Sequence, residues 1–415
     1  YIAIRNSLGR VDCKLPAMGA PALLARISKL LVLSYVLDWV FIIAVALFGY
    51  AFYKQTPNQH PFSLSDPGIS YPYTEHETVT TSTLILVSVL APAAIVLIGA
   101  LAIVPGTAAQ ADTKPSKSQT LRRKLWEWNV GWMGLGVALA GVWMSTQGLK
   151  VLIGKPRPDL LARCNPNLDD IATYAVGGLG EKLSGAATLV SYKICQDQSS
   201  LVAIDGFSSF PSGHSSFSFS GLGYLTLWLC AKFSVGFPYF PSYPVKGVDY
   251  KEENSVRTRG AAPPVPLMVI TFVPTATAFF IAASRWFNYR HHGFDIIFGS
   301  LMGMAFAWIG FNMYHLPIRQ GAGWAWGPRA RRRAFIRGIG FPSSLGIDSW
   351  AYKRSDSTNE QSERDVENGN CNINGHGHSD INGHSNGHTN ENESLPMQAW
   401  LMRSPVSPLS ERPQV

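Results

Sequence analysis

The chain has 415 residues and a formal net charge of +8, with 46% hydrophobic and only 15% charged residues. Length alone would allow two or three soluble domains, but several stretches of about 20 residues carry almost no charge, which is the length that crosses a bilayer core. The basic residues lie mostly beside these stretches, so membrane orientation explains the charge better than nucleic-acid binding does.

Six apolar segments are predicted to be membrane-spanning helices, because every backbone polar group must be satisfied within lipid. In chain order they cover residues 30–52, 83–104, 128–149, 215–233, 267–283 and 296–314. The sequence therefore predicts an all-α, polytopic membrane protein with six transmembrane helices.

Basic residues mark alternate segments between these spans, as the positive-inside rule requires. They gather before the first span, between the second and third (Lys114, Lys117, Arg122, Arg123 and Lys124), and after the sixth. The loop after the first span is acidic instead, with Asp66, Glu75 and Glu77. Both termini are therefore expected in the cytosol.

Composition divides the chain into four parts. Residues 1–27 form a cytosolic N-terminal segment, 28–316 the six-span domain, 317–354 a basic cytosolic segment, and 355–415 a low-complexity tail. The tail is rich in Asn, Gly, Ser and His and too poor in large apolar residues to bury a core, so disorder is expected. Its histidines could bind a metal weakly, but a solvated tail is the simpler interpretation.

Three polar clusters interrupt the apolar half of the chain and fall on the same, non-cytosolic face in this topology. They cover residues 150–158, 211–214 and 284–295. Ionisable groups at membrane helix ends are costly and usually mark a functional site. This mixture of cations and histidines suggests a site that binds an anion and moves protons.

His291 and Asp295 are four residues apart, so they would share a helix face if the sixth helix begins near them. A carboxylate beside an imidazole fixes its tautomer and leaves the other ring nitrogen as a nucleophile or base. Alternatively, the pair only caps the helix and stabilises it.

The cations Lys150, Arg157 and Arg285 have no nearby run of acidic partners in the sequence. Guanidinium groups match phosphate oxygens with two parallel hydrogen bonds. Lys150 and Arg157 could instead anchor the helix ends to lipid headgroups.

The segment Pro211–His214 immediately precedes the fourth span. Ser212 and Gly213 would expose backbone N–H groups at a helix N-terminus, which suits an anion, and His214 could donate a proton to a leaving oxygen. A plain helix start with Ser212 as N-cap is the alternative.

Together the clusters resemble the three-part signature of the type 2 phosphatidic acid phosphatase (PAP2) superfamily. The matching residues are Lys150-x6-Arg157-Pro158, Pro211-Ser212-Gly213-His214 and Ser284-Arg285-x5-His291-x3-Asp295. The phrases GKPRPDLLARC and FPSGHSSFSFSGLGYLTLWL extend the likeness to lipid phosphate phosphatases, especially fungal diacylglycerol pyrophosphate phosphatases. It covers roughly residues 28–316.

The resemblance implies a helical core like that of vanadium haloperoxidases and a phosphatase without metal or other cofactor. Its substrates would be phosphatidic acid, diacylglycerol pyrophosphate and lysophosphatidic acid in the bilayer, reached from the lumenal or extracellular face of a membrane that the sequence does not identify. By the same resemblance, His291 attacks phosphorus to form a phosphohistidine, Asp295 orients His291, and His214 protonates the departing oxygen. The phosphate would be held by Lys150, Arg157, Arg285, Ser212 and Gly213.

Other functions remain open at this stage. A different branch of the superfamily would act on sphingoid phosphates, dolichyl pyrophosphate or sugar phosphates, and a membrane transporter or receptor would bind phospholipid without turnover. A vanadate-dependent peroxidase is disfavoured by the six spans. A zinc site built from His214, His291, His292 and Asp295 is disfavoured because the clustered cations would repel a divalent ion.

Two further features could affect assembly. Cys164 and Cys195 share the large non-cytosolic loop and could form a disulfide in an oxidising lumen, although spacing alone does not fix the pairing. Gly299 and Gly303 give a small-xxx-small spacing in the sixth span, which serves either a homodimer contact or packing within one chain.

Overall fold

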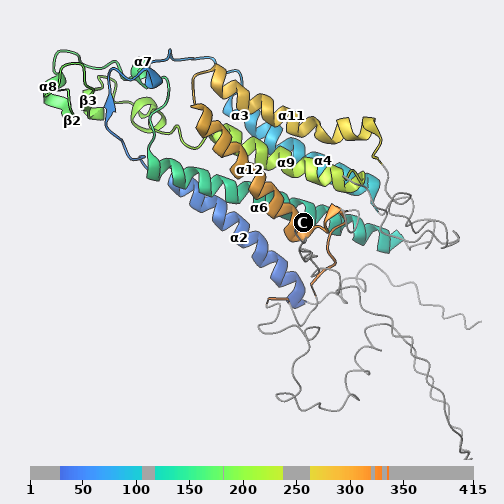
Figure 1. Ribbon diagram of the computed structural model, residues 1–415. Coiled ribbons are helices and arrows are strands. Elements are labelled where there is room, and N and C mark those ends of the chain that lie inside the picture. Colours follow the sequence, from blue (N-terminus) through green and yellow to red (C-terminus); the bar gives the residue numbers. More distant parts are fainter. Residues whose placement is uncertain are drawn as a thin grey trace, which may run out of the picture. The chain divides into compact units, whose positions relative to one another are not determined.

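Helices dominate the computed structural model, which describes residues 29–104, 117–180, 182–236, 262–318, 323–329 and 334–335 (Figure 1). The expected N-terminal segment and low-complexity tail lie outside these residues. The long helices are α2 (Lys29–Tyr53), α3 (Thr81–Ile85), α4 (Ala91–Ile103), α6 (Lys117–Ile153), α9 (Gly213–Lys232), α11 (Val265–Phe287) and α12 (Gly293–Tyr314). A π-helical turn, Leu86–Leu90, joins α3 to α4 without a break.

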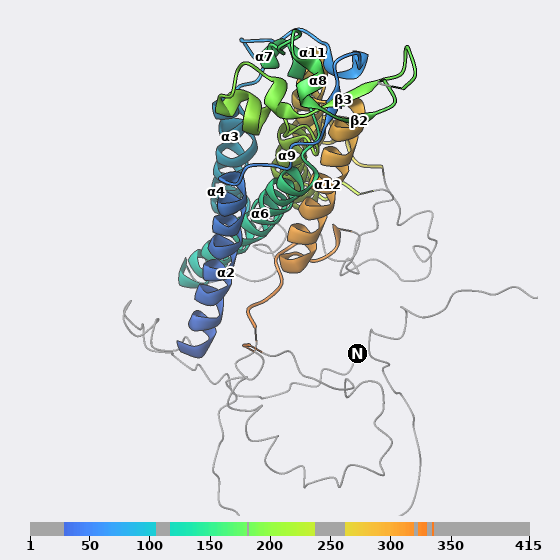
Figure 2. The ribbon, with the colours of Figure 1, turned by 90° about the vertical axis from the view of Figure 1, so that its left-hand side faces the viewer.

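Five helical segments of the described chain are long and apolar enough to cross a membrane: α2, the run from α3 to α4, α6, α11 and α12. They coincide with five of the six expected spans. The remaining expected span, the fourth, corresponds to α9, which is rich in serine and glycine, and most of its residues are buried. Its neighbours are α12, α11, α6 and α4 (Figures 1 and 2). A helix enclosed by other helices does not need a lipid-facing apolar surface, so its hydropathy is lower.

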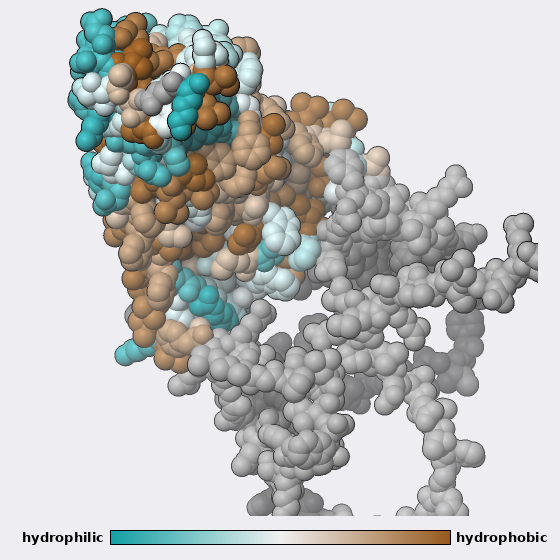
Figure 3. Space-filling model, turned by 60° about the vertical axis from the view of Figure 1, so that its left-hand side comes forward, coloured by the Kyte–Doolittle hydropathy of each residue, from teal (hydrophilic) through white to brown (hydrophobic). Residues whose placement is uncertain are grey.

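The surface of the helix bundle also indicates which helices face lipid. The helices present hydrophobic side chains outward, while hydrophilic residues gather at one end (Figure 3). On α2, Phe41, Leu47 and Phe48 are all more than 60% exposed. Such large apolar surfaces are unusual in a soluble monomer and fit a lipid environment.

α6 differs from the expected span, because it begins at Lys117 and runs for 37 residues. The basic residues Lys117, Arg122, Arg123 and Lys124 are therefore on a helix and not in a loop as predicted. Hydropathy identifies only the part of a helix that lies in lipid, and a helix can continue beyond it at no cost in backbone hydrogen bonding.

Glycine allows the closest helix contacts. A Cβ atom at Gly303 of α12 would collide with the carbonyl oxygen of Ser216 on α9, and one at Gly221 of α9 would collide with that of Ser88 in the π-helical turn. The small-xxx-small spacing at Gly299 and Gly303 thus serves packing of α12 on α9 within the chain. The backbone N–H of Ser212 also donates to the carbonyl of Asp295 at 3.1 Å, which ties the starts of α9 and α12 together.

Residues 54–80 and 154–210 form a small cap at one end of the bundle. It holds a three-stranded antiparallel sheet in the order β1 (Phe62–Ser63), β3 (Thr188–Val190), β2 (Ala175–Gly178), and the short helices α7 (Leu160–Cys164) and α8 (Ile171–Tyr174). A disulfide joins Cys164 to Cys195, so the pairing left open by the sequence is formed. Both sulfurs lie in an apolar cluster with Leu160, Val190 and Phe207.

Near the start of α6, at the end away from the cap, residues 323–329 contact α6 and α2. Trp126 donates its indole N–H to the carbonyl of Trp326 at 2.8 Å, and Glu127 accepts the backbone N–H of Ala325 at 2.9 Å. Arg329 forms an ion pair with Asp38 of α2 at 2.5 Å. The charge within the first span is therefore neutralised by the chain that follows the last one.

Candidate active site

The three polar clusters meet beneath the cap. Lys150 is in the last turn of α6, Arg285 in the last turn of α11, and His214 in the first turn of α9. Arg157 lies in the loop before α7, and His291 lies in the short loop between α11 and α12. We call these five residues the catalytic cluster. Three helices and two loops therefore supply one site.

His291 is almost completely buried and oriented by the backbone. Its Nδ1 lies 2.6 Å from the carbonyl oxygen of Ser209, which can only accept, so Nδ1 carries the proton. The lone pair is then on Nε2, which lies 3.5 Å from Nη1 of Arg157. Burial, followed by the charges of Arg157 and Lys150, holds the pKa of His291 well below its usual value. These surroundings favour the neutral imidazole, whose Nε2 lone pair faces the Arg157 guanidinium.

Asp295 contacts a different set of groups from the one expected. Its carboxylate accepts from Lys155 Nζ at 2.8 Å, from Ser209 Oγ at 2.6 Å, and from the backbone N–H of His292 at 3.2 Å. The helix that carries Asp295 begins at Gly293, so His291 lies outside it and the four-residue spacing does not bring the two side chains together. Asp295 reaches His291 through Ser209 instead.

Arg157 is held by an acidic residue of the cap. Its Nε donates to the carbonyl of Asp205 at 2.7 Å and its Nη2 to the Asp205 carboxylate at 2.6 Å. Arg163 donates to the other carboxylate oxygen, also at 2.6 Å. Although burial raises the pKa of Asp205, the charges of Arg157, Arg163 and Arg290 outweigh it and keep that pKa well below the usual range.

Arg285 also has an acidic partner. Its Nη1 donates to Glu77 at 2.8 Å and its Nη2 to the carbonyl of Val79 at 3.0 Å. Arg290 pairs with the other oxygen of Glu77. Arg157 and Arg285 thus have acidic partners in the structure, although no run of acidic residues lies near them in the sequence. The acids come from distant cap segments, which sequence proximity does not reveal.

The start of α9 has features of both predictions, a helix start with Ser212 as N-cap and an anion-binding N-terminus. Ser212 is the N-cap, and its hydroxyl accepts the backbone N–H of Ser215 at 3.4 Å. Nε2 of His214 is buried and has no hydrogen-bond partner within the described chain. Lys150 Nζ lies 3.5 Å from where a Cβ of Gly213 would be. The N-terminus of α9 therefore brings together the Ser212 hydroxyl, an unpartnered imidazole nitrogen and an ammonium group.

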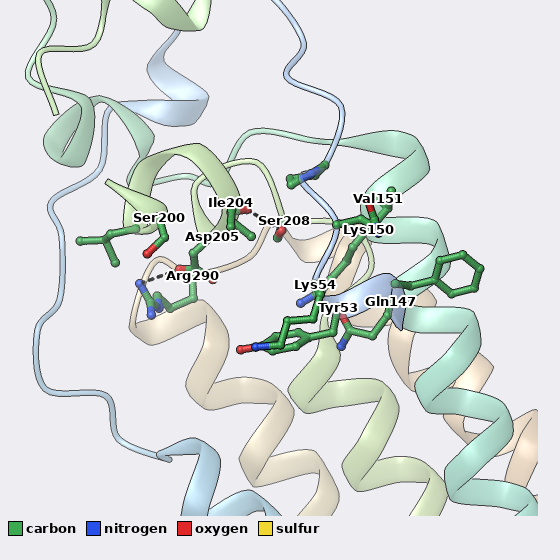
Figure 4. Close-up of a pocket in the computed structure, with 14 residues that line it drawn as sticks. Tyr53, Lys54, Gln147, Lys150, Val151, Ser200, Ile204, Asp205, Ser208 and Arg290 are labelled. Atoms are coloured by element: carbon green, nitrogen blue, oxygen red, sulfur yellow. Dashed lines mark hydrogen bonds and ion pairs between the residues drawn. The ribbon is translucent and has the colours of Figure 1, made fainter. Parts of the chain in front are cut away.

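A pocket of about 570 Å³ opens beside this cluster (Figure 4). Its walls come from the end of α2, the end of α6, and the cap segment 200–208, with Arg290 at its inner side. Lys150 is shared between the pocket and the catalytic cluster. Among the described residues, no group of three or more His, Cys, Asp or Glu side chains gathers as a metal site.

Sequence reasoning missed several residues of this network. Lys155 and Arg290 lie inside the polar clusters and could have been noted as charges beside the motifs. Glu77 and Asp205 lie in loops on the same predicted face, but no spacing rule connects them to their arginines. Ser209 contacts His291 through its backbone carbonyl, for which an amino-acid sequence carries no signal, and Asp295 through its hydroxyl.

The chain matches the family model described as PAP2 superfamily over residues 130–319. It is 30% identical to diacylglycerol pyrophosphate phosphatase 1 of Saccharomyces cerevisiae over 68% of this chain and 80% of that protein. The probable diacylglycerol pyrophosphate phosphatase 1 of Schizosaccharomyces pombe is 31% identical over 68% of this chain and 81% of its own length. Lipid phosphate phosphatase 2 of Arabidopsis thaliana is 27% identical over 51% of this chain and 59% of its own length. No solved structure matches.

Proposed function

Because this chain belongs to the PAP2 superfamily and is a lipid phosphatase of the membrane, we propose that it hydrolyses phosphatidic acid, diacylglycerol pyrophosphate and lysophosphatidic acid through a phosphohistidine at His291. The observation that carries the mechanism is the state of His291. Its Nδ1 proton is held by the Ser209 carbonyl, and its Nε2 lone pair faces Arg157. A neutral, oriented imidazole is what nucleophilic attack on phosphorus requires.

The proposed reaction has two steps. Nε2 of His291 attacks phosphorus, the bond from phosphorus to the leaving oxygen breaks, and His214 gives that oxygen a proton. Water then attacks the phosphohistidine, loses a proton to His214, and releases inorganic phosphate and free His291. The buried, unpartnered Nε2 of His214 supports this role, because nothing within the described chain occupies it.

The charge balance of the site supports a dianionic phosphate. Five basic side chains (Lys150, Arg157, Arg163, Arg285 and Arg290) face three acidic ones (Glu77, Asp159 and Asp205) in the described network. Two positive charges remain for the substrate. Phosphoryl transfer depends mainly on such positioning and charge stabilisation. Lys150, Arg157 and Arg285 would hold the phosphate oxygens, with Ser212 and the N–H of Gly213 assisting.

The proposed topology has six spans, with α9 as the fourth, both termini in the cytosol and the cap on the lumenal or extracellular face. The disulfide supports an oxidising compartment for the cap. A site at the helix ends would let the acyl chains of the substrate stay in lipid while the headgroup enters. We retain residues 28–316 as the phosphatase domain, followed by the basic segment 317–354.

The decisive experiment is His291→Ala in purified protein, with phosphate release measured from a lipid panel in detergent micelles and EDTA present. We expect wild-type turnover with chelator and loss of at least about 10³-fold in kcat for the variant, since no other group can form the covalent bond. His60→Ala, at an exposed position of the cap, is the matched control. Retained turnover by His291→Ala would refute the mechanism.

The same panel separates the alternatives. Preference for sphingoid phosphates or dolichyl pyrophosphate would assign another branch of the superfamily. Binding of phospholipid by wild-type protein without phosphate release would assign a transporter or receptor.

A further inference from the structure

The pocket beside the catalytic cluster has an unusual charge distribution. Three basic side chains border it from three elements: Lys54 from the end of α2, Lys150 from the end of α6, and Arg290 from the loop before α12. Figure 4 shows Arg290 and Asp205 to one side of the hollow and Lys150 to the other. Asp205 is the acid in this wall, and Arg157 and Arg163 already occupy its two carboxylate oxygens. The free donors of the pocket are therefore cationic.

Arg290 and Lys150 both retain unused donors here. Arg290 pairs with Glu77 through Nη2, and its Nη1 lies 3.5 Å from Asp159 and 3.7 Å from Asp205, but its buried Nε makes no hydrogen bond within the described chain. The Lys150 ammonium has no hydrogen-bond or ion-pair partner among the described residues. Buried donors are normally satisfied, so the unbonded Nε–H of Arg290 and the unpartnered ammonium of Lys150, which border the same cavity, indicate an anionic ligand.

Lys54 stands at the outer border of this pocket. Its ammonium lies 5.3 Å from the ring centroid of Tyr50 and 5.8 Å from that of Tyr53, so cation–π contacts hold it near the helix end. Phe52 and Tyr53 also line the pocket. Aromatic and basic residues at the end of an apolar helix are typical of the membrane–water boundary, where a lipid headgroup would enter.

The pocket adjoins the catalytic cluster, with which it shares Lys150. Arg290 directly precedes His291 in the chain, and Lys150 lies beside Gly213, next to His214. A phosphate at His291 would thus have a second cationic space next to it, on the route to the bilayer. A phosphate monoester leaves that space empty, whereas a diphosphate places a second anion in it.

We propose that Lys54, Lys150 and Arg290 form a subsite for the second phosphate of a lipid diphosphate, so that the terminal phosphate lies at His291 and the lipid-linked phosphate lies in the pocket. This inference rests on the proposed function and assigns the residues that distinguish diphosphate from monophosphate lipids. The volume, about 570 Å³, is within the range of ordinary ligand pockets.

Lys54→Gln tests the subsite, because Lys54 is exposed and is not part of the catalytic cluster. We expect kcat/KM for diacylglycerol pyrophosphate to fall about fivefold, the size of one partly exposed charge pair, and kcat/KM for phosphatidic acid with the same acyl chains to stay within about twofold. Lys54→Arg should restore the diphosphate rate. Lys193→Gln, an exposed lysine elsewhere on the cap, should change neither substrate.

A second arm uses free anions to separate the phosphate chemistry from the lipid. Inorganic pyrophosphate should inhibit phosphatidic acid hydrolysis more strongly than inorganic phosphate does, and Lys54→Gln should reduce that difference. If the difference is lost while the diphosphate lipid rate is unchanged, the pocket binds free pyrophosphate and the lipid assignment is wrong.

The proposal is overturned if Lys54→Gln lowers both lipid rates equally or leaves both unchanged. Neither result would refute the proposed function, which the His291→Ala variant tests separately. Conversely, retained turnover by His291→Ala would refute the mechanism while leaving the inhibition difference measurable.

Discussion

Ser209 links the two groups that the sequence motif would pair directly. Its backbone carbonyl accepts the Nδ1 proton of His291, and its hydroxyl donates to the carboxylate of Asp295, each at 2.6 Å. In the proposed mechanism Asp295 would act as a positioning residue, because it contacts the residue whose carbonyl holds the imidazole. A side-chain substitution at Ser209 removes the second contact and keeps the first.

Ser209→Ala should therefore lower kcat by about tenfold, the loss expected for one charge-assisted hydrogen bond, with KM nearly unchanged. Asp295→Asn should have a similar effect, and the double variant should lose little more than either single one, because both act through the same contact. Steady-state kinetics on phosphatidic acid measure this, with Ser199→Ala as the exposed control. A loss for Asp295→Asn as large as that for His291→Ala would argue for direct contact between the two side chains.

At the scale of elements, hydropathy predicted the apolar helices closely. α2 spans Lys29–Tyr53 against an expected 30–52, and α12 spans Gly293–Tyr314 against 296–314. The cap was not predicted, because its strands have two to four residues and its stability comes from the disulfide and from tertiary contacts. Short elements of this kind carry almost no periodic signal.

The candidate site, like the fold, was predicted only in part from the sequence. The cation and histidine positions lie in motifs and were found, and the structure brings them together. Their acidic partners were not found, because Glu77 and Asp205 reach Arg285 and Arg157 only through the fold. Long-range pairs between single residues leave no pattern along one sequence.

The disulfide connects the cap to the catalytic cluster through neighbouring residues. Cys164 follows Arg163, which binds Asp205, which binds Arg157. Replacing both cysteines with serine should destabilise the cap by about 2–4 kcal/mol and lower kcat/KM, with the larger effect in KM because the anion-binding cation loses its support. Thermal unfolding in detergent and kinetics measure the two effects. Cys230→Ser in α9, which leaves the disulfide intact, should preserve KM.

At the scale of the whole molecule, stability should depend on pH through His291. Its folded pKa lies below the unfolded value of about 6.5, so folding favours the neutral form. This contribution is complete above pH 6.5 and is lost as pH falls below it, because the unfolded chain then takes up the proton. Asp205, with its lowered pKa, contributes in the same direction only at lower pH, below about 3.8.

His291→Gln should therefore gain stability relative to wild type as pH falls from 7 to 5, by up to about 1.4 kcal/mol per pH unit below 6.5. Unfolding midpoints of the two proteins in detergent, measured across this range, give the difference. A difference that stays constant with pH would mean that folding does not change the pKa of His291.

The contact between the starts of α9 and α12 has a consequence for inhibition. The Ser212 N–H donates to the Asp295 carbonyl, and Gly303 brings the two helices into direct backbone contact. His214, His291 and the N-terminus of α9 are thus arranged before any ligand arrives, so a compound that imitates pentacoordinate phosphorus should bind with little loss of entropy from reorganisation of the site. Vanadate, which adopts that geometry readily, should bind far more tightly than tetrahedral phosphate of equal charge.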